Sequence, residues 1–211
     1  MKYLLLGLLA GLLMLAWRSW RRAGRARFIE SFPLQARLDQ RLAARRPSLS
    51  ESQRGEVLEG LRDYFLICNR AGRRMVAMPS QAVDDAWHEF ILFTRQYDTF
   101  CHKAFGRFLH HTPVEAMASP TQAGDGIRLA WRLACAHEGI DPKTPARLPR
   151  LFALDAALGI AGGFVFRLDC LAAGQTGNSD GYCASHIGCS SGCAGDSGGD
   201  SGGDGGGCGG D

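Results

Sequence analysis

An uncharged apolar run close to the N-terminus decides where this chain can reside. Tyr3 to Trp17 contains fifteen residues without a charged side chain. As a helix this run spans about 22 Å, less than the ~30 Å hydrocarbon core of a membrane. Ser19 and Trp20, together with flanking basic side chains that reach the interface, extend it. The sequence therefore predicts a transmembrane anchor over residues 1–20.

The residues that follow the apolar run are strongly basic. Positive side chains next to a single anchor hold that side of the chain in the cytoplasm, and they attract anionic lipid headgroups. Segment 21–27 forms the basic juxtamembrane part. Lipid explains the wider basic segment 18–46 better than nucleic acid does, because the segment adjoins the anchor and lacks interleaved stacking aromatics. A cleaved signal peptide is the alternative, but only Lys2 precedes the apolar run and no convincing cleavage site follows it. The arginines are Arg18, Arg21, Arg22, Arg25 and Arg27.

Residues 28–173 have the apolar spacing of helices, and the sequence predicts a mainly α body there. Leucines recur every four residues before Pro47, and Ser48–Glu51 fits a capping box at the start of a second helix that ends at Gly72. The further elements predicted are a central helix from the N-cap Ser80 to about Gly106, a loop at 119–126, a helix at Ile127–His137, a short helix or extended run at Leu151–Ile160, and a strand at Phe164–Cys170.

The composition changes at Gly174. Fifteen of the 28 glycines lie in residues 174–211, and from residue 168 onward aspartate is the only type with a fixed charge. Such a segment buries too little apolar surface to offset the entropy of ordering it. We therefore expect a disordered tail rich in glycine and cysteine.

The central helix carries the first candidate site. Asp84 and His88 are four residues apart and share one face of the helix. His110 and His111 follow the helix, and either can approach this pair if the chain doubles back. Carboxylate and imidazole groups bind zinc. A hydrogen-bonded structural histidine is the simpler interpretation of the same residues.

The tail carries a second candidate site. Cys183, His186, Cys189 and Cys193 are separated by two, two and three residues. Thiolate and imidazole groups at short spacing can surround a tetrahedral zinc ion. In the reducing cytoplasm such cysteines are ligands or redox groups rather than structural disulfides. A tail with no ligand is the alternative.

The central stretch resembles the glycine-rich domain protein family, known from plants and with small bacterial relatives. The resemblance rests on a proline before Val83-Asp84, then Trp87-His88, a later tyrosine and cysteine, and His110-His111-Thr-Pro. It covers residues 79–113 best and residues 148–170 more loosely. The resemblance implies no defined reaction, and it implies that bacterial relatives often end in Gly/Cys-rich tails.

These features favour a membrane-tethered interaction or metal-handling module, with a protein partner as a further prediction. The alternative is a metal-dependent enzyme that uses Asp84, His88 and a later histidine. Cys101 is of the right type for thiol catalysis, but it lies about 20 Å along a straight helix from His88 and on another face. Phosphate-binding loops and nucleophile elbows are absent from the sequence.

Overall fold

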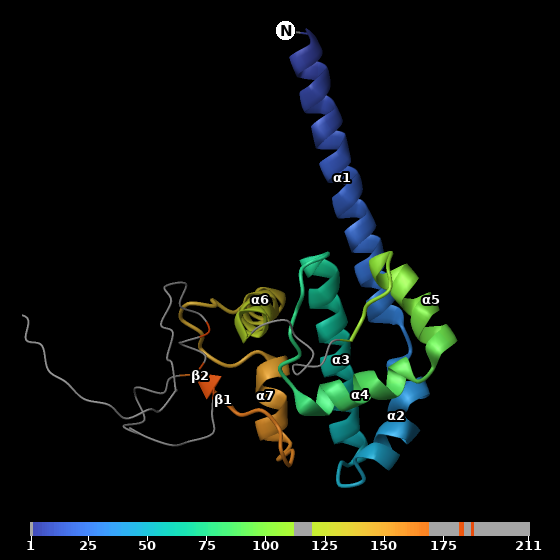
Figure 1. Cartoon of the computed structure of the whole chain (residues 1–211), viewed down its shortest axis with the longest axis vertical. Helices are drawn as coiled ribbons and strands as arrows, with labels where there is room; N and C mark the ends of the chain where they lie inside the picture. Colours follow the sequence, from blue (N-terminus) through green and yellow to red (C-terminus); the bar gives the residue numbers. More distant parts are fainter. Residues whose placement is uncertain (1, 112–119, 169–181, 184–186, 188–211) are drawn as a thin grey trace, which may run out of the picture.

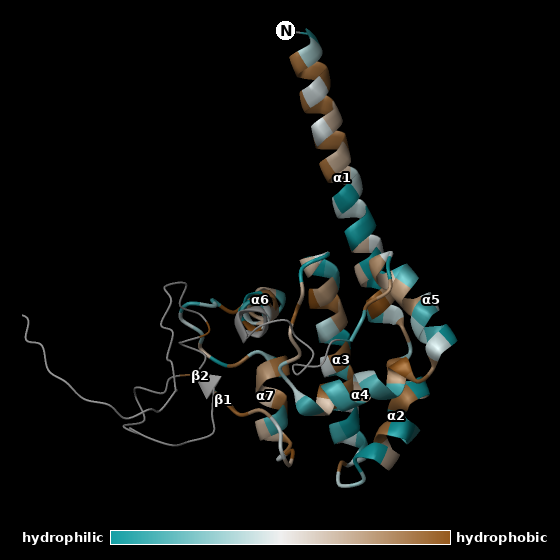
Figure 2. Cartoon of the chain, in the orientation of Figure 1, coloured by the Kyte–Doolittle hydropathy of each residue, from teal (hydrophilic) through white to brown (hydrophobic). Residues whose placement is uncertain are grey.

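The apolar run and the arginines after it form one continuous helix. The computed structural model describes residues 2–111, 120–168, 182–183 and 187. Helix α1 (Lys2–Ser31) projects from the body as a stalk (Figure 1). The outer part of this helix is largely apolar (Figure 2). Its large apolar side chains are exposed, whereas Ile29 near its end is buried. Within the described residues, one helix is long and apolar enough to cross a membrane, and the end of the same helix enters the core.

The prediction of a mainly helical chain is confirmed, since 71% of it is helical. The body contains six helices and a two-stranded parallel sheet among the residues described. These are α2 (Leu34–Arg45), α3 (Glu51–Ala71), α4 (Gln81–Ile91), α5 (Thr94–Phe105), α6 (Pro120–Glu138), α7 (Arg150–Ala157), β1 (Phe166–Arg167) and β2 (Tyr182–Cys183).

Helix α3 lies at the centre of the body. It contacts α1, α2, α4, α5, α6 and α7. Leu58, Leu61 and Phe65 on α3 are at most 1% exposed. At Gly60 the neighbouring helices come so close that an added Cβ would lie 2.9 Å from Cγ2 of Val83. The burial of these apolar side chains, each worth about 1.5–3 kcal/mol, holds the other helices around α3.

An aromatic cluster joins α3 to α4 and α5. The ring of Phe100 lies 4.9 Å from that of Phe65 and 5.2 Å from that of Phe90, measured between centroids. Phe32, directly after α1, packs 4.8 Å from Phe100. Rings at these distances attract one another in addition to burying apolar area. The cluster therefore fixes the angle between α4 and α5.

The predicted single central helix is wrong, because two helices occupy it. Helix α4 ends at Ile91, and Phe93 adopts φ −82° and ψ 57°, which lies outside the helical region. The resulting turn brings Tyr97 back beside Trp87, so that the Tyr97 hydroxyl lies 3.0 Å from the indole nitrogen of Trp87. On a straight helix ten residues would separate these side chains by about 15 Å.

Other local predictions have mixed outcomes. Ser80 caps α4, and Gly72 ends α3 with φ 70°, as predicted. The capping box uses Ser50 and Gln53 instead of Ser48 and Glu51. Helix α6 begins at Pro120 in place of the predicted loop, which is compatible with the ease of placing proline in the first turn of a helix.

The strand predicted near the end of the body is short. Phe166 and Arg167 pair in parallel with Tyr182 and Cys183. This partner strand lies inside the segment expected to be disordered. Apart from these two residues and Ile187, the tail from residue 174 lies outside the described residues.

Candidate metal centre

Asp84 and His88 lie one turn apart on α4 and contact each other. Nδ1 of His88 is 3.3 Å from Oδ2 of Asp84. Asp84 belongs to the first turn of the helix, where the partial positive charge of the helix N-terminus stabilises a carboxylate. The spacing of the two residues is sufficient to explain this contact.

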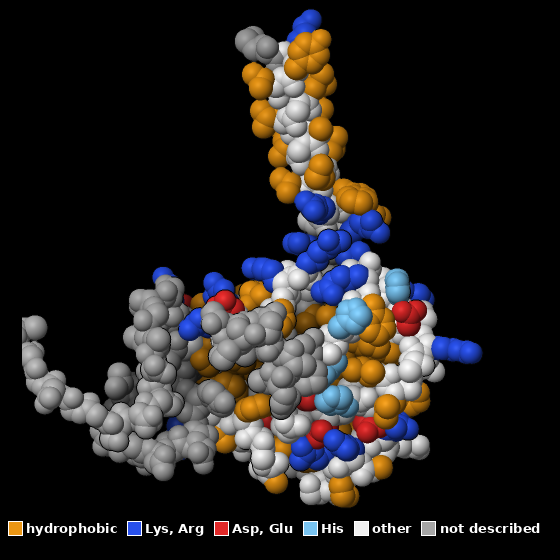
Figure 3. Space-filling model, viewed as in Figure 1, with side chains coloured by type: hydrophobic (Ala, Val, Ile, Leu, Met, Phe, Trp, Pro, Cys, Tyr) orange, Lys and Arg blue, Asp and Glu red, His pale blue; other side chains and the backbone are white. Residues whose placement is uncertain are grey.

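His111 approaches the same carboxylate from a distant part of the chain. Its Nε2 is 2.8 Å from Oδ1 of Asp84, and its ring centroid is 4.3 Å from that of His88. One potential ligand atom from each of the three residues lies within 4.8 Å of the others. Figure 3 shows histidine side chains gathered on this face of the body, below the arginine-rich base of α1.

The turn between α4 and α5 explains how His111 returns to α4. Helix α5 ends at Gly106, which has φ 71°. The Tyr97 hydroxyl accepts a hydrogen bond from Trp87 and donates one of 2.6 Å to the carbonyl of Leu109. Since Leu109 is held beside α4, His111 two residues later packs at 4.6 Å from the Trp87 ring.

A buried carboxylate holds the N-terminal end of α4 in place. Asp155 on α7 is 2% exposed. It accepts hydrogen bonds from the Ser80 hydroxyl at 2.6 Å and from the backbone N–H groups of Gln81, Ala82 and Phe164. This carboxylate satisfies donors that the first turn of a helix leaves free. Asp155 therefore positions Asp84, although it does not contact it.

The three side chains differ in their access to solvent. The side chains of Asp84 and His111 are 19% and 14% exposed, and that of His88 is 46% exposed. The neighbouring carboxylates are engaged elsewhere: Asp85 pairs with Arg46, and Glu89 pairs with Arg41 at 2.6 Å. Asp84 is therefore the carboxylate available to an ion at this place.

The three residues fit the ligand set of a zinc ion. Zinc binds imidazole nitrogen and carboxylate oxygen at about 2.0–2.2 Å in a tetrahedron, so its ligand atoms lie about 3.3 Å apart. His111 lies 2.8 Å from one oxygen of Asp84 and His88 lies 3.3 Å from the other, and one ligand atom from each of the three residues lies within 4.8 Å of the others, so small side-chain shifts would bring them to this spacing. Three protein ligands leave the fourth position open.

The other predicted ligands are not part of this group. His110 is exposed, and its ring packs 4.8 Å from that of Phe108. Cys183 lies in β2, while His186, Cys189 and Cys193 lie outside the described residues. Zinc binding by the tail therefore stays a prediction.

The buried cysteines do not suit thiol catalysis. Cys68, Cys101 and Cys135 are free thiols in the core. Burial raises the pKa of Cys68 to about 12 and that of Cys135 to about 11, and it also raises the pKa of Cys101. The attacking species in such chemistry is the thiolate, which these environments disfavour at neutral pH.

Comparison with protein families gives a match over most of this structure. The model of the UCP032817-like family matches residues 24–187, from the basic part of α1 to just beyond β2. The chain belongs to the UCP032817-like family. This match corrects the resemblance to the glycine-rich domain family, which the comparison does not support. The Trp-His and His-His-x-Pro features that carried the resemblance are only two to four residues long. Neither a curated protein nor a solved structure matches this member of the family.

The sequence gives no signal for two residues that position the site in this UCP032817-like chain. Tyr97 and Asp155 act through partners ten to seventy-five residues away. A tyrosine on an amphipathic helix and an aspartate on a short helix are ordinary in composition. The role of Tyr97 depends on the tertiary turn after α4, which contains neither glycine nor proline. The role of Asp155 depends on the packing of α7 against the start of α4.

Proposed function

We propose that this protein is a membrane-tethered metal-handling module that binds zinc through Asp84, His88 and His111. The observation that supports the proposal is one carboxylate contacted by two imidazoles, one from the same helix and one from a segment 27 residues away. Binding through three ligands leaves a fourth position for water or for a group on a partner.

A hydrogen-bonded cluster without metal is the competing explanation. Asp84 then shares its two oxygens between His88 and His111. The imidazole rings are 4.3 Å apart, so one ion can reach a nitrogen of each. A zinc ion binds neutral imidazoles and neutralises the carboxylate. This geometry supports the proposal of a shared ion.

The membrane assignment follows from α1. Its exposed apolar side chains need a nonpolar environment, and its basic residues lie at one end of that apolar surface. By the positive-inside rule the body then faces the cytoplasm, close to anionic headgroups. In this proposal the candidate metal centre lies on the cytoplasmic side.

The test is the zinc content of the full chain, purified in detergent under reducing conditions. We expect the double variant His88→Ala/His111→Ala to lose one equivalent of zinc relative to the parent. His102→Ala is the matched control, because His102 and Asp98 also lie four residues apart at 3.4 Å but have no second imidazole in the described structure. Zinc retained in full by the double variant would contradict the proposal.

A second pair of substitutions tests whether the zinc is bound by the tail or by the body. In Cys189→Ser/Cys193→Ser the zinc bound by Asp84, His88 and His111 should remain. Cobalt substitution gives an independent readout, since thiolate ligands produce a strong charge-transfer band that nitrogen and oxygen ligands do not. A cobalt spectrum without this band in the tail variant is the expected result.

A metal-dependent hydrolase is the second candidate, favoured by the open fourth position and the exposed side of His88. Zinc at such a position lowers the pKa of bound water to about 7. The described surroundings supply no second free carboxylate as a general base, which favours binding over catalysis. Zinc-dependent hydrolysis of ester or phosphoester substrates that is lost in Asp84→Asn would favour catalysis over binding alone.

A further inference from the structure

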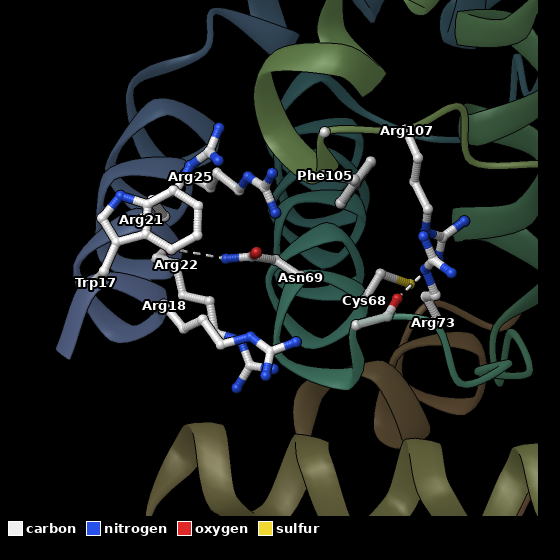
Figure 4. Close-up of a pocket in the computed structure, with 12 residues that line it drawn as sticks. Trp17, Arg18, Arg21, Arg22, Arg25, Cys68, Asn69, Arg73, Phe105 and Arg107 are labelled. Carbon is white, nitrogen blue, oxygen red and sulfur yellow. Dashed lines mark hydrogen bonds between the residues drawn. The ribbon is translucent and has the colours of Figure 1, made fainter. Parts of the chain in front are cut away.

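A basic cavity lies where α1 enters the body, on elements separate from the metal centre. It has a volume of about 280 Å³ and lies between α1, the end of α3 and the residues that follow α5. Figure 4 shows arginine side chains on both sides of Asn69 at the end of α3. The cavity is lined by Arg18, Arg21, Arg22, Arg25, Arg73 and Arg107.

The positive charge of this cavity has no acidic counterpart in its lining. Arg107 donates hydrogen bonds to the carbonyls of Gly72 and Phe108. The other five arginines make no ion pair with an acid within the described ranges of the chain. Burial, together with the nearby charges of Arg21 and Arg22, lowers the pKa of Arg25. Six guanidinium groups therefore share a space that the protein itself leaves positively charged.

The helix C-termini at the cavity neutralise only part of its positive charge. Helices α3 and α5 both end at the cavity, at Gly72 and Gly106. Each helix C-terminus carries about half a negative charge, so the two together offset roughly one of the six arginines. The remaining positive charge is available to an external anion.

Glycines at the ends of α3 and α5 lie beside arginine side chains of α1. A Cβ at Gly106 would lie 2.0 Å from Nη2 of Arg25 and would displace the end of this side chain, and the φ of 71° at this position also favours glycine. At Gly72 an added Cβ would lie 3.9 Å from Nη2 of Arg22, and the Gly72 carbonyl accepts a bond of 2.8 Å from Arg107. Arginines from α1 and from the body thus meet at the end of α3.

The cavity also lies at the height expected for the membrane surface. Trp17 lines it, and the Arg21 guanidinium lies 4.8 Å from the centre of the Trp17 ring. Tryptophan is typical of the membrane–water interface, where lipid phosphate groups lie. Planar guanidinium groups bind the oxygens of tetrahedral phosphate in pairs. We propose that this cavity binds a phosphate group, supplied either by an anionic phospholipid headgroup or by a soluble phosphate ester.

Calorimetric titration of the full chain in neutral maltoside micelles tests this proposal. The probes are dihexanoyl phosphatidylglycerol, glycerol 3-phosphate and dihexanoyl phosphatidylcholine. We expect saturable binding of at least one of the first two, and weaker binding of the zwitterionic lipid. In Arg22→Gln/Arg73→Gln the dissociation constant should rise at least about tenfold, since each charged hydrogen bond contributes on the order of tenfold or more.

The matched control is Arg95→Gln/Arg132→Gln. It removes the same charge from exposed arginines outside the cavity, and the dissociation constant should change by less than about twofold. Circular dichroism should show equal helix content in both double variants.

Binding of both anionic probes supports a phosphate site open to either source. Binding of the lipid alone supports a headgroup site, and binding of glycerol phosphate alone supports a site for a soluble ester. No saturable binding, or an equal loss in the two double variants, would overturn the proposal and leave only a general attraction between opposite charges.

Discussion

Tyr97 joins two segments whose contact creates the candidate metal centre. Its hydroxyl accepts from the Trp87 indole and donates to the Leu109 carbonyl, and all three groups are buried. Without the hydroxyl, one buried donor and one buried acceptor lose their partner. Each such loss costs roughly 1–3 kcal/mol, whereas the ring itself still fills its place.

We therefore expect Tyr97→Phe to lower the free energy of unfolding by about 1–3 kcal/mol and to weaken zinc binding without removing a ligand. Thermal unfolding of the detergent-solubilised chain, followed by circular dichroism, measures the first effect, and zinc titration with a chelator competitor measures the second. Tyr64→Phe is the control. It also removes a buried hydrogen bond, to the Val76 carbonyl, but on a segment that does not carry His111. Equal zinc affinities in the two variants would refute the positioning role of Tyr97.

Asp155 fixes the start of α4 from another helix. Replacing it with asparagine leaves one oxygen for four donors and removes the charge that favours them. Asp155→Asn should lower the free energy of unfolding by roughly 2–3 kcal/mol in the same thermal experiment. Asp125→Asn, on an aspartate whose side chain is 71% exposed, should change it by less than about 0.5 kcal/mol. Equal effects of the two substitutions would contradict the role of Asp155 in holding the start of α4.

The contact between α3, α6 and α7 gives a pH-dependent contribution to stability. His137 on α6 faces Asp63 on α3, with Arg150 of α7 and Glu138 beside them. The hydrogen bond to Asp63 raises the pKa of His137 above 6.5. Because the folded state binds this proton more tightly, the stabilisation is complete below about pH 6.5 and is lost as pH rises through the raised pKa.

Unfolding of the parent chain should therefore become easier as pH rises above about 6.5 and through the raised pKa of His137. His137→Gln should show a smaller dependence on pH in this range than the parent does. Melting temperatures measured in steps of half a pH unit give the comparison, with His102→Gln as the control. A parent and variant with parallel curves would show that His137 does not cause the effect.

Most helices could be predicted from local sequence signals, but the candidate metal centre could not. Ser80 and Gly72 have the chemistry of helix ends, and Leu34, Leu38 and Leu42 mark a buried face, so these elements were predictable. The turn at Leu92–Phe93 has neither glycine nor proline, and the apolar period continues across it. It forms because Tyr97 and the aromatic cluster find partners that are distant in sequence. The Asp84–His88 pair could be predicted from its spacing, but the arrival of His111 could not.

At the scale of the whole molecule, α1 combines an apolar outer part with a base packed into the core. Arginine near the centre of a membrane span costs about 2.5–3.5 kcal/mol on insertion scales. Leu8→Arg/Leu12→Arg should therefore release the chain from membranes washed with alkaline carbonate. Ala23→Arg/Gly24→Arg adds the same charge to the same helix beyond the apolar run and should stay in the pellet. Equal retention of both variants would exclude α1 as the anchor.

The unbroken course of α1 limits the reach of the protein. A flexible linker would let a tethered domain sweep through a hemisphere above the bilayer, but a helix of 30 residues is about 45 Å of stiff rod. Under the proposed insertion of its outer part, the rod sets the distance of the body from the membrane surface. Asp84, His88 and His111 would then lie at one height above that surface, and a membrane-bound partner that exchanges a metal ion with them would have to present its own group at the same height.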